Sequence, residues 1–277
     1  MKISLVTNAA SKDASRLLHI IPHWVRVFDQ RLAELCVLVD TKPIEGRIAD
    51  LHAVPANLEA VRGVLSQLAV EYKQLRWREL DYSSLERVSR QWWTRGSPVR
   101  CQAGSPIFAF AASITEARTP IVLRADCDML FSDYGWVGEA LRRLEADECD
   151  IVSPPRLGRN SLEFSTRAFL VDWTKFRSRC LPMKSMRLDW LRSAQRWVRG
   201  RPIVRAFEDT INQEIKSGRI QHTILPEELG SSMHVIRADD TEDPVFPSVV
   251  ARWEKWEIPQ AQFESKWEWN YCRDAWK

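Results

Sequence analysis

The chain has 277 residues, of which 45% are hydrophobic and 28% are charged, a balance that is typical of globular proteins and excludes a disordered chain. Its formal net charge is +3, too close to neutrality to indicate nucleic acid as a partner. The six cysteines form no Cys-x-x-Cys pair, and no apolar run approaches the roughly 20 residues that cross a bilayer. We therefore expect reduced thiols and a cytoplasmic protein that is neither exported nor membrane-spanning.

The first 130 residues alternate short apolar runs with longer segments of helical period, which is typical of a parallel α/β sheet. Four strands are predicted, at residues 3–7, 35–39, 75–80 and 121–125. Helices are predicted from a cap at Ser11 to Phe28, with a kink or break at Pro22, and at residues 55–72 and 105–117. The pattern predicts that polar residues following these strands gather at the carboxyl edge of the sheet, where ligands of such sheets bind.

The second half continues with a predicted helix at 136–146, a strand at 150–153 and a further strand at 164–171, which we expect to be antiparallel. Ten basic residues and one acid lie between Lys175 and Arg205. Within this region residues 183–199 have helical period with Trp and Leu on one face. A basic helix of this kind packs against the core or lies peripherally on an anionic membrane at the inner face, and the pattern leaves both open.

Two acidic motifs carry the chemistry. Asp126 and Asp128 follow the strand at 121–125 in the sequence IVLRADCDML, and two carboxylates so close favour a divalent cation between them or an exposed turn. Glu208 and Asp209 begin a predicted helix in FEDTINQEI, where the helix dipole favours negative charge and a simple capping role is the alternative. His234 follows in the Gly/Ser-bracketed stretch ELGSSMHVIR, which predicts a turn.

Taken in order, these segments resemble the GT-A-fold glycosyltransferases, in particular glycosyltransferase family 2. The resemblance covers ISLVTN, VLVD, PIFAFAASITEARTPIVLRADCDMLF with its DxD motif, FSTRAFLVDWTKF, FEDT and the downstream histidine. The chain departs from many relatives in lacking Gly-Gly before the acidic pair and in carrying Cys127 between the two aspartates. The resemblance implies one α/β domain over 1–277, with a nucleotide-sugar-binding half (1–130), an acceptor and catalytic half (131–240) and a Trp-rich C-terminal extension (241–277).

The resemblance also implies roles for individual residues. Asp128 binds Mn²⁺ or Mg²⁺, with His234 as a further ligand and Asp126 supporting the ion and touching the sugar or ribose. Asp209 is the general base and Glu208 its acidic neighbour. Donor contacts are expected from four more residues, Thr7, Asp40, Asp81 and Arg124, and an ordinary polar role at a strand end is the alternative for each.

We therefore expect an inverting glycosyltransferase with a nucleotide-sugar donor, UDP-sugar being favoured, and a glycan, lipid-linked or small-molecule acceptor. A phosphatase of the haloacid-dehalogenase type is disfavoured because its nucleophilic Asp lies on the first strand. A nucleotidyltransferase remains an alternative, although TNAASKD is not the Gly-rich basic loop that follows its first strand. A non-catalytic protein that binds carbohydrate or membrane is the third hypothesis. Five tryptophans in the last thirty residues line an acceptor site or pack over the sheet.

Overall fold

The structure is a computed structural model, and it describes residues 1–43, 56–94, 99–101, 104, 106–157, 163–183, 207–235, 246–263, 271–272 and 276. The basic segment predicted as a helix at 183–199 lies outside these residues except for Met183, as do Trp267 and Trp269. Among the described helices, none combines the length and the apolar character needed to cross a bilayer.

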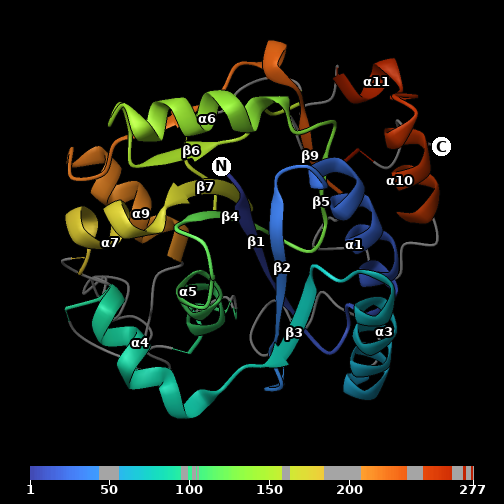
Figure 1. Cartoon of the computed structure of the whole chain (residues 1–277), viewed down its shortest axis with the longest axis horizontal. Coiled ribbons are helices and arrows are strands. Elements are labelled where there is room, and N and C mark those ends of the chain that lie inside the picture. The colour runs from blue at the N-terminus through green and yellow to red at the C-terminus, as the bar shows by residue number, and fades with distance from the viewer. Residues whose placement is uncertain are drawn as a thin grey trace, which may run out of the picture.

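Four parallel strands form the N-terminal half of a seven-stranded sheet (Figure 1). They are β1 (Ile3–Ala9), β2 (Leu32–Val39), β3 (Leu75–Glu79) and β4 (Ile121–Ala125), in the spatial order β3-β2-β1-β4. Alternate side chains of these strands enter two different cores: Leu5 packs with the helices on one face and Val6 with those on the other. This two-sided burial explains why the strands read as continuous apolar runs.

Helices cover both faces of this half. One face carries α1 (Ala14–Phe28) and α3 (Leu58–Glu71), and the other carries α4 (Leu85–Trp92) and α5 (Phe108–Thr115). Helix α1 is preceded by Asp13 and not by the predicted cap Ser11, so it starts two residues later, because Asp13 accepts a 2.7 Å bond from the Ala10 amide and holds residues 10–13 in a turn. Pro22 lies inside α1, which runs on to Phe28 without a break. Helix α4 was not predicted.

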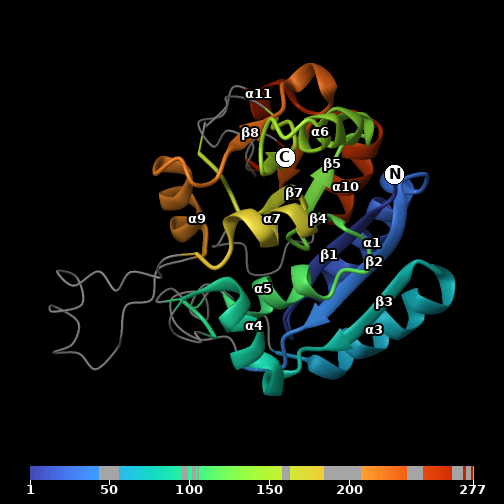
Figure 2. The ribbon, with the colours of Figure 1, turned by 60° about the vertical axis from the view of Figure 1, so that its left-hand side comes forward.

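The second half extends the sheet in the order β4-β7-β6-β8 with β6 (Ile151–Ser153), β7 (Ala168–Asp172) and β8 (His222–Ile224). Strand β7 runs antiparallel to both β4 and β6, as predicted, but it starts four residues later because residues 165–167 form a loop. This half also contains α6 (Gly135–Glu145), α7 (Trp173–Cys180) and α9 (Phe207–Lys216). Helices α7 and α9 lie side by side at this end of the sheet (Figure 2). The fold is thus a mostly parallel α/β sheet flanked by helices, as predicted.

A two-stranded antiparallel ribbon pairs β5 (Met129–Phe131) with β9 (Ser232–His234), and short helical turns occur at Tyr82–Ser84 and Glu227–Leu229. The prediction that His234 lies in a turn is therefore wrong. Its strand exists only through pairing with a segment about a hundred residues earlier, which the local Gly/Ser pattern cannot reveal.

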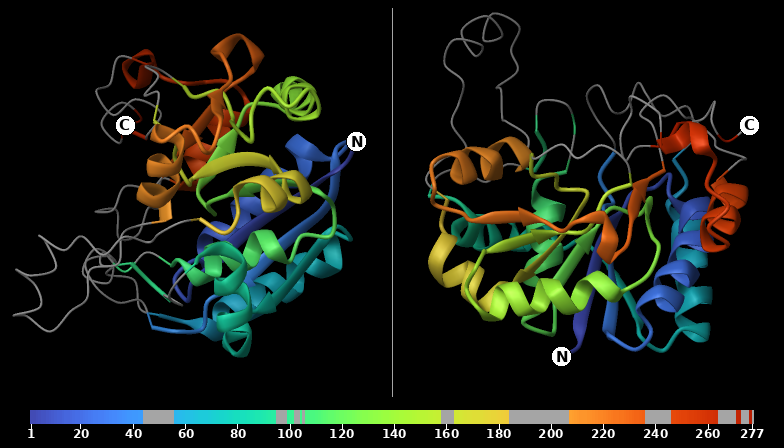
Figure 3. Two further views of the ribbon diagram at one scale, coloured as in Figure 1. Left: turned by 90° about the vertical axis from the view of Figure 1, so that its left-hand side faces the viewer. Right: turned by 90° about the horizontal axis from the view of Figure 1, so that it is seen from above.

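The C-terminal helix α10 (Phe246–Glu254) stands beside α1 (Figure 3, right), and α11 (Gln260–Phe263) follows it in the chain. His23 of α1 joins this contact: its Nδ1 lies 3.1 Å from Glu254, and its Nε2 accepts a bond from the Phe131 amide of β5. Trp253 and Trp276 are buried, as expected if the tail packs over the fold, whereas Trp256 is half exposed.

Candidate metal and nucleotide site

Three predicted metal-binding side chains meet at the carboxyl end of β4. Ligand atoms of Asp126, Asp128 and His234 lie within 4.8 Å of one another. The ribbon brings them together, since Met129 pairs with His234 and the Val235 amide donates to the Asp128 carbonyl at 3.0 Å. Asp128 Oδ1 and His234 Nδ1 are buried without a hydrogen-bond partner among the residues that the structure describes. Two carboxylates and an imidazole, with these two atoms free to coordinate a cation, fit Mn²⁺ or Mg²⁺.

The two aspartates are electrostatically unequal. Burial opposes the ionisation of Asp128, but His234, whose Nε2 lies 3.1 Å from Oδ2, outweighs it together with Arg16 and Arg167, and the pKa of Asp128 falls to about 2. Burial and the Asp128 charge raise the pKa of Asp126 in spite of its ion pair with Arg124. Asp128 is therefore the carboxylate that is ionised over the widest pH range, which suits a ligand of a cation.

Arg124 holds Asp126 from inside the protein. Its Nη2 lies 2.6 Å from Asp126 Oδ1, and its guanidinium sits 4.5 Å from the centre of the Phe110 ring. The arginine is 3% exposed, so its contact in this structure is with the aspartate and the aromatic core. We predicted Arg124 as a donor contact, and its position favours a different task, which is to orient Asp126.

The second acidic motif is tied to the same turn. Glu208 Oε2 accepts bonds from the Thr166 amide at 3.0 Å, the Thr166 hydroxyl at 3.1 Å and the Ser165 hydroxyl at 3.2 Å. The next carbonyl, of Arg167, accepts the Asp126 amide at 2.7 Å. Glu208 thereby holds the loop at residues 165–167, which in turn bonds to the DxD turn. Asp209 is exposed in the first turn of α9.

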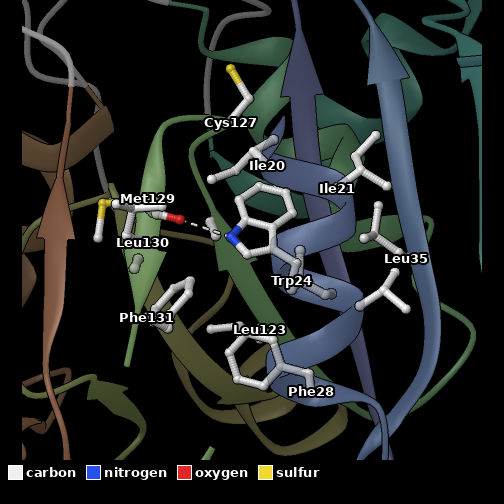
Figure 4. Packing of buried hydrophobic residues seen from close by; sticks show 14 of the residues in the cluster. Ile20, Ile21, Trp24, Phe28, Leu35, Leu123, Cys127, Met129, Leu130 and Phe131 are labelled. Atoms are coloured by element: carbon white, nitrogen blue, oxygen red, sulfur yellow. Dashed lines mark hydrogen bonds between the residues drawn. The ribbon is translucent and has the colours of Figure 1, made fainter. Parts of the chain in front are cut away.

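Buried packing beneath the turn fixes the ribbon (Figure 4). The indole of Trp24, fully buried in α1, donates to the Met129 carbonyl at 2.8 Å. Cys127 lies above the same cluster, and burial raises the pKa of its thiol well above the usual range. The residue between the two aspartates is therefore a neutral packing group.

The predicted donor contacts at the other strand ends occupy different surroundings. Asp40, at the end of β2, is buried, and its carboxylate binds the Tyr82 hydroxyl, the Lys42 amide at 3.0 Å and Arg100 Nη2 at 2.6 Å. Thr7 is buried on β1, with its hydroxyl 3.5 Å from the Asn8 carbonyl. Asp81 is exposed and accepts the Ser83 amide at 2.9 Å, which is a local cap of the turn.

Sequence reasoning missed four residues near these groups. Tyr82 and Arg100 close around Asp40, and Lys42 lies 4.1 Å from the centre of the Tyr82 ring. Arg16 pairs with Asp13 at 3.0 Å. Tyr82 directly follows the predicted strand end at Asp81, and Arg16 lies three residues after Asp13, so both were within reach of the sequence argument. The contacts of Arg100 with Asp40 and of Lys42 with Tyr82 depend on tertiary structure.

No family model and no curated protein matches the chain. Among solved structures, the mannosyltransferase PcManGT from Pyrobaculum calidifontis, in complex with GDP-Man and Mn²⁺, aligns with a TM-score of 0.50 at 11% identity. That alignment covers 83% of this chain and 56% of PcManGT, so the chain spans little more than half of that protein.

Two other structures align less well. An active-site mutant of LgtC has a TM-score of 0.45 at 15% identity, over 81% of this chain and 73% of its own. The inositol-1-phosphate CTP transferase from T. maritima has a TM-score of 0.48 at 9% identity, over 92% and 97%. At such identities the likeness concerns architecture alone. The chain has a GT-A-like fold of the nucleotide-diphospho-sugar transferase type.

Proposed function

We propose that this protein is a metal-dependent, inverting glycosyltransferase that uses a nucleotide-diphosphate sugar, with UDP-sugar as the favoured donor. The observation that carries the proposal is the convergence of Asp126, Asp128 and His234 within 4.8 Å at the carboxyl edge of a GT-A-like sheet. The acceptor belongs to one of three classes: a glycan, a lipid-linked sugar or a small molecule.

Asp128 and His234 hold the divalent ion, Mn²⁺ or Mg²⁺, and Asp126 supports it while contacting the sugar or ribose. When bound, the ion supplies positive charge to the diphosphate that departs as the glycosidic bond breaks. The ionised Asp128 and the buried open atoms of both ligands support this assignment. Asp40 and Thr7 are the donor contacts at the neighbouring strand ends, with Tyr82 closing over Asp40.

Asp209 takes the proton from the acceptor hydroxyl as its oxygen attacks the anomeric carbon, and the nucleoside diphosphate leaves from the opposite side. A single displacement of this kind inverts the anomeric centre. The exposure of Asp209 supports this role because an incoming acceptor reaches it, while the bonds of Glu208 to Thr166 keep α9 beside the DxD turn. General base catalysis typically contributes about 10²–10⁴-fold to the rate.

The decisive experiment compares purified wild type, Asp128→Ala, Asp209→Asn and Glu86→Gln with a panel of nucleotide sugars and Mn²⁺. Glu86 is the matched control, because it is also an exposed acid in the first turn of a helix. We expect Asp128→Ala to lose metal-dependent nucleotide binding, Asp209→Asn to bind but not transfer, and Glu86→Gln to behave as wild type.

Release of a nucleoside diphosphate from the nucleotide sugar, with the sugar recovered on an acceptor, identifies transfer. Pyrophosphate release in a parallel assay with a nucleoside triphosphate and a sugar 1-phosphate would identify a nucleotidyltransferase and overturn the proposal. Full activity in both aspartate variants would also overturn it. Flotation with anionic liposomes tests whether residues 183–199 bring the enzyme to a lipid-linked acceptor.

A further inference from the structure

A hollow of about 590 Å³ opens at the end of the β5–β9 ribbon that is remote from the metal group. Its walls include Ser132 and Asp133 after β5, Glu228 and Gly230 before β9, and Trp256 after α10. None of the roles proposed above uses these residues. Ser132 lies four residues beyond Asp128, which corresponds to about 13 Å along an extended chain.

Trp256 is the unusual member of this wall. Its side chain is 51% exposed, and its backbone has φ of +58°, a left-handed conformation that is strained for a bulky residue. The indole packs edge-on against the buried Trp253, with ring centres 5.6 Å apart. The fold therefore holds a large apolar ring in solvent at the rim of a hollow and supports it from below, at a conformational cost. Residues held in this way cluster at binding sites.

The opposite wall is polar and rigidly built. Asp133 Oδ1 accepts the Gly135 amide at 2.6 Å, and Oδ2 accepts the Ser132 hydroxyl at 2.8 Å. A side chain at position 135 would place its Cβ 2.9 Å from Asp133 Oδ1, and Gly230 has φ of +132°, so both positions favour glycine. Glu227 and Glu228 also line the hollow, and no basic residue of the described chain does.

We propose that this hollow is a sugar-binding subsite for an uncharged or ammonium-bearing sugar ring. An aromatic face covers the C–H face of a sugar, and it attracts a protonated amine when one is present. Carboxylate oxygens accept bonds from hydroxyl or ammonium groups. The same carboxylates repel a uronic acid or a phosphorylated sugar. The proposal rests on the proposed function in one respect, which is that the bound ring is a distal unit of the acceptor, lying along the ribbon away from the reacting hydroxyl.

Binding is measured by saturation-transfer NMR on the full chain without nucleotide or metal, with methyl β-glucoside, glucosamine and glucuronate as probes. Trp256→Asn removes the indole and keeps a residue that tolerates the left-handed backbone, so the variant is expected to fold. Phe263→Ala is the control, because Phe263 is also an exposed aromatic side chain of the C-terminal helices but does not line the hollow.

We expect wild type and Phe263→Ala to bind the glucoside and glucosamine, glucuronate to bind most weakly, and Trp256→Asn to weaken binding by about tenfold. Equal binding to wild type and Trp256→Asn, or preference for glucuronate, overturns the proposal. So does Trp256-dependent binding to lipid vesicles without binding to any sugar.

Asp128→Ala separates the two proposals. This variant should keep sugar binding in the hollow while losing metal-dependent nucleotide binding. If nucleotide binding is unchanged but the Trp256-dependent sugar signal remains, the proposed function fails and the subsite stands. If nucleotide binding is lost and no sugar binds, the subsite fails alone.

Discussion

Replacing Trp24 by Phe tests how the core beneath the DxD turn supports the site. Trp24 is fully buried, and its indole N–H donates to the Met129 carbonyl at 2.8 Å (Figure 4). The smaller ring loses buried carbon contacts worth about 1–2 kcal/mol. The loss of the donor adds about 1–3 kcal/mol, because the buried carbonyl loses this partner. We expect the free energy of unfolding to fall by about 2–5 kcal/mol in total.

Trp136→Phe is the matched control. Trp136 is also fully buried in the same core, but its indole nitrogen has no hydrogen-bond partner in the described part of the chain. Its replacement therefore loses similar contacts and no hydrogen bond, and the difference between the two variants should be about 1–3 kcal/mol. Urea unfolding followed by far-UV circular dichroism measures it, and Mn²⁺ titration should show weaker binding only for Trp24→Phe. Equal destabilisation by the two changes would refute the importance of this bond.

Three further predictions concern the pKa of His23, the arginine behind Asp126 and the division of labour in the acidic pair. Burial lowers the pKa of His23 below its usual 6.5 although Glu254 opposes the shift, so the unfolded chain takes up a proton that the folded one does not. Stability should therefore fall by up to about 1.4 kcal/mol per pH unit below pH 6.5, and urea midpoints that fall as steeply in His23→Gln would contradict this. Arg124→Lys keeps the positive charge but removes the planar group over Phe110, and it should cost about 1–3 kcal/mol in urea unfolding; a change below about 0.5 kcal/mol would show that the planar guanidinium is dispensable. Glu208→Ala should weaken Mn²⁺ binding in calorimetry by releasing the Thr166 loop, whereas Asp209→Asn should leave it intact, and the opposite pattern would exchange their roles.

The sequence predicts those features of the fold and the site that depend on a local pattern of residues, and it misses those that depend on contacts with distant segments. The strands at 3–7, 35–39 and 121–125 were predicted because both of their faces are buried, and the placement of Asp126 and Asp128 at a strand end followed from that. The inward ion pair of Arg124 was not predictable, since a polar residue in a buried strand gives no indication of which face it takes or what it meets. The strand of His234 was missed for a related reason, because three residues with one distant partner leave no periodic pattern. Asp81 and Asp40 look alike in sequence at their strand ends, yet one caps an exposed turn and the other is enclosed by Tyr82 and Arg100.

The ribbon also sets when the metal site can exist during folding. Ser132 and Ser231 bond to each other across 99 residues of chain, so β9 reaches β5 only after a large loop has closed, and loop closure of this length carries an entropic cost that local contacts do not repay. His234 and Asp128 therefore come together only when β9 pairs with β5. An ion bound by both residues would hold β9 against β5 in the folded protein. It would slow amide hydrogen exchange in β5 and β9 more than in any other described strand.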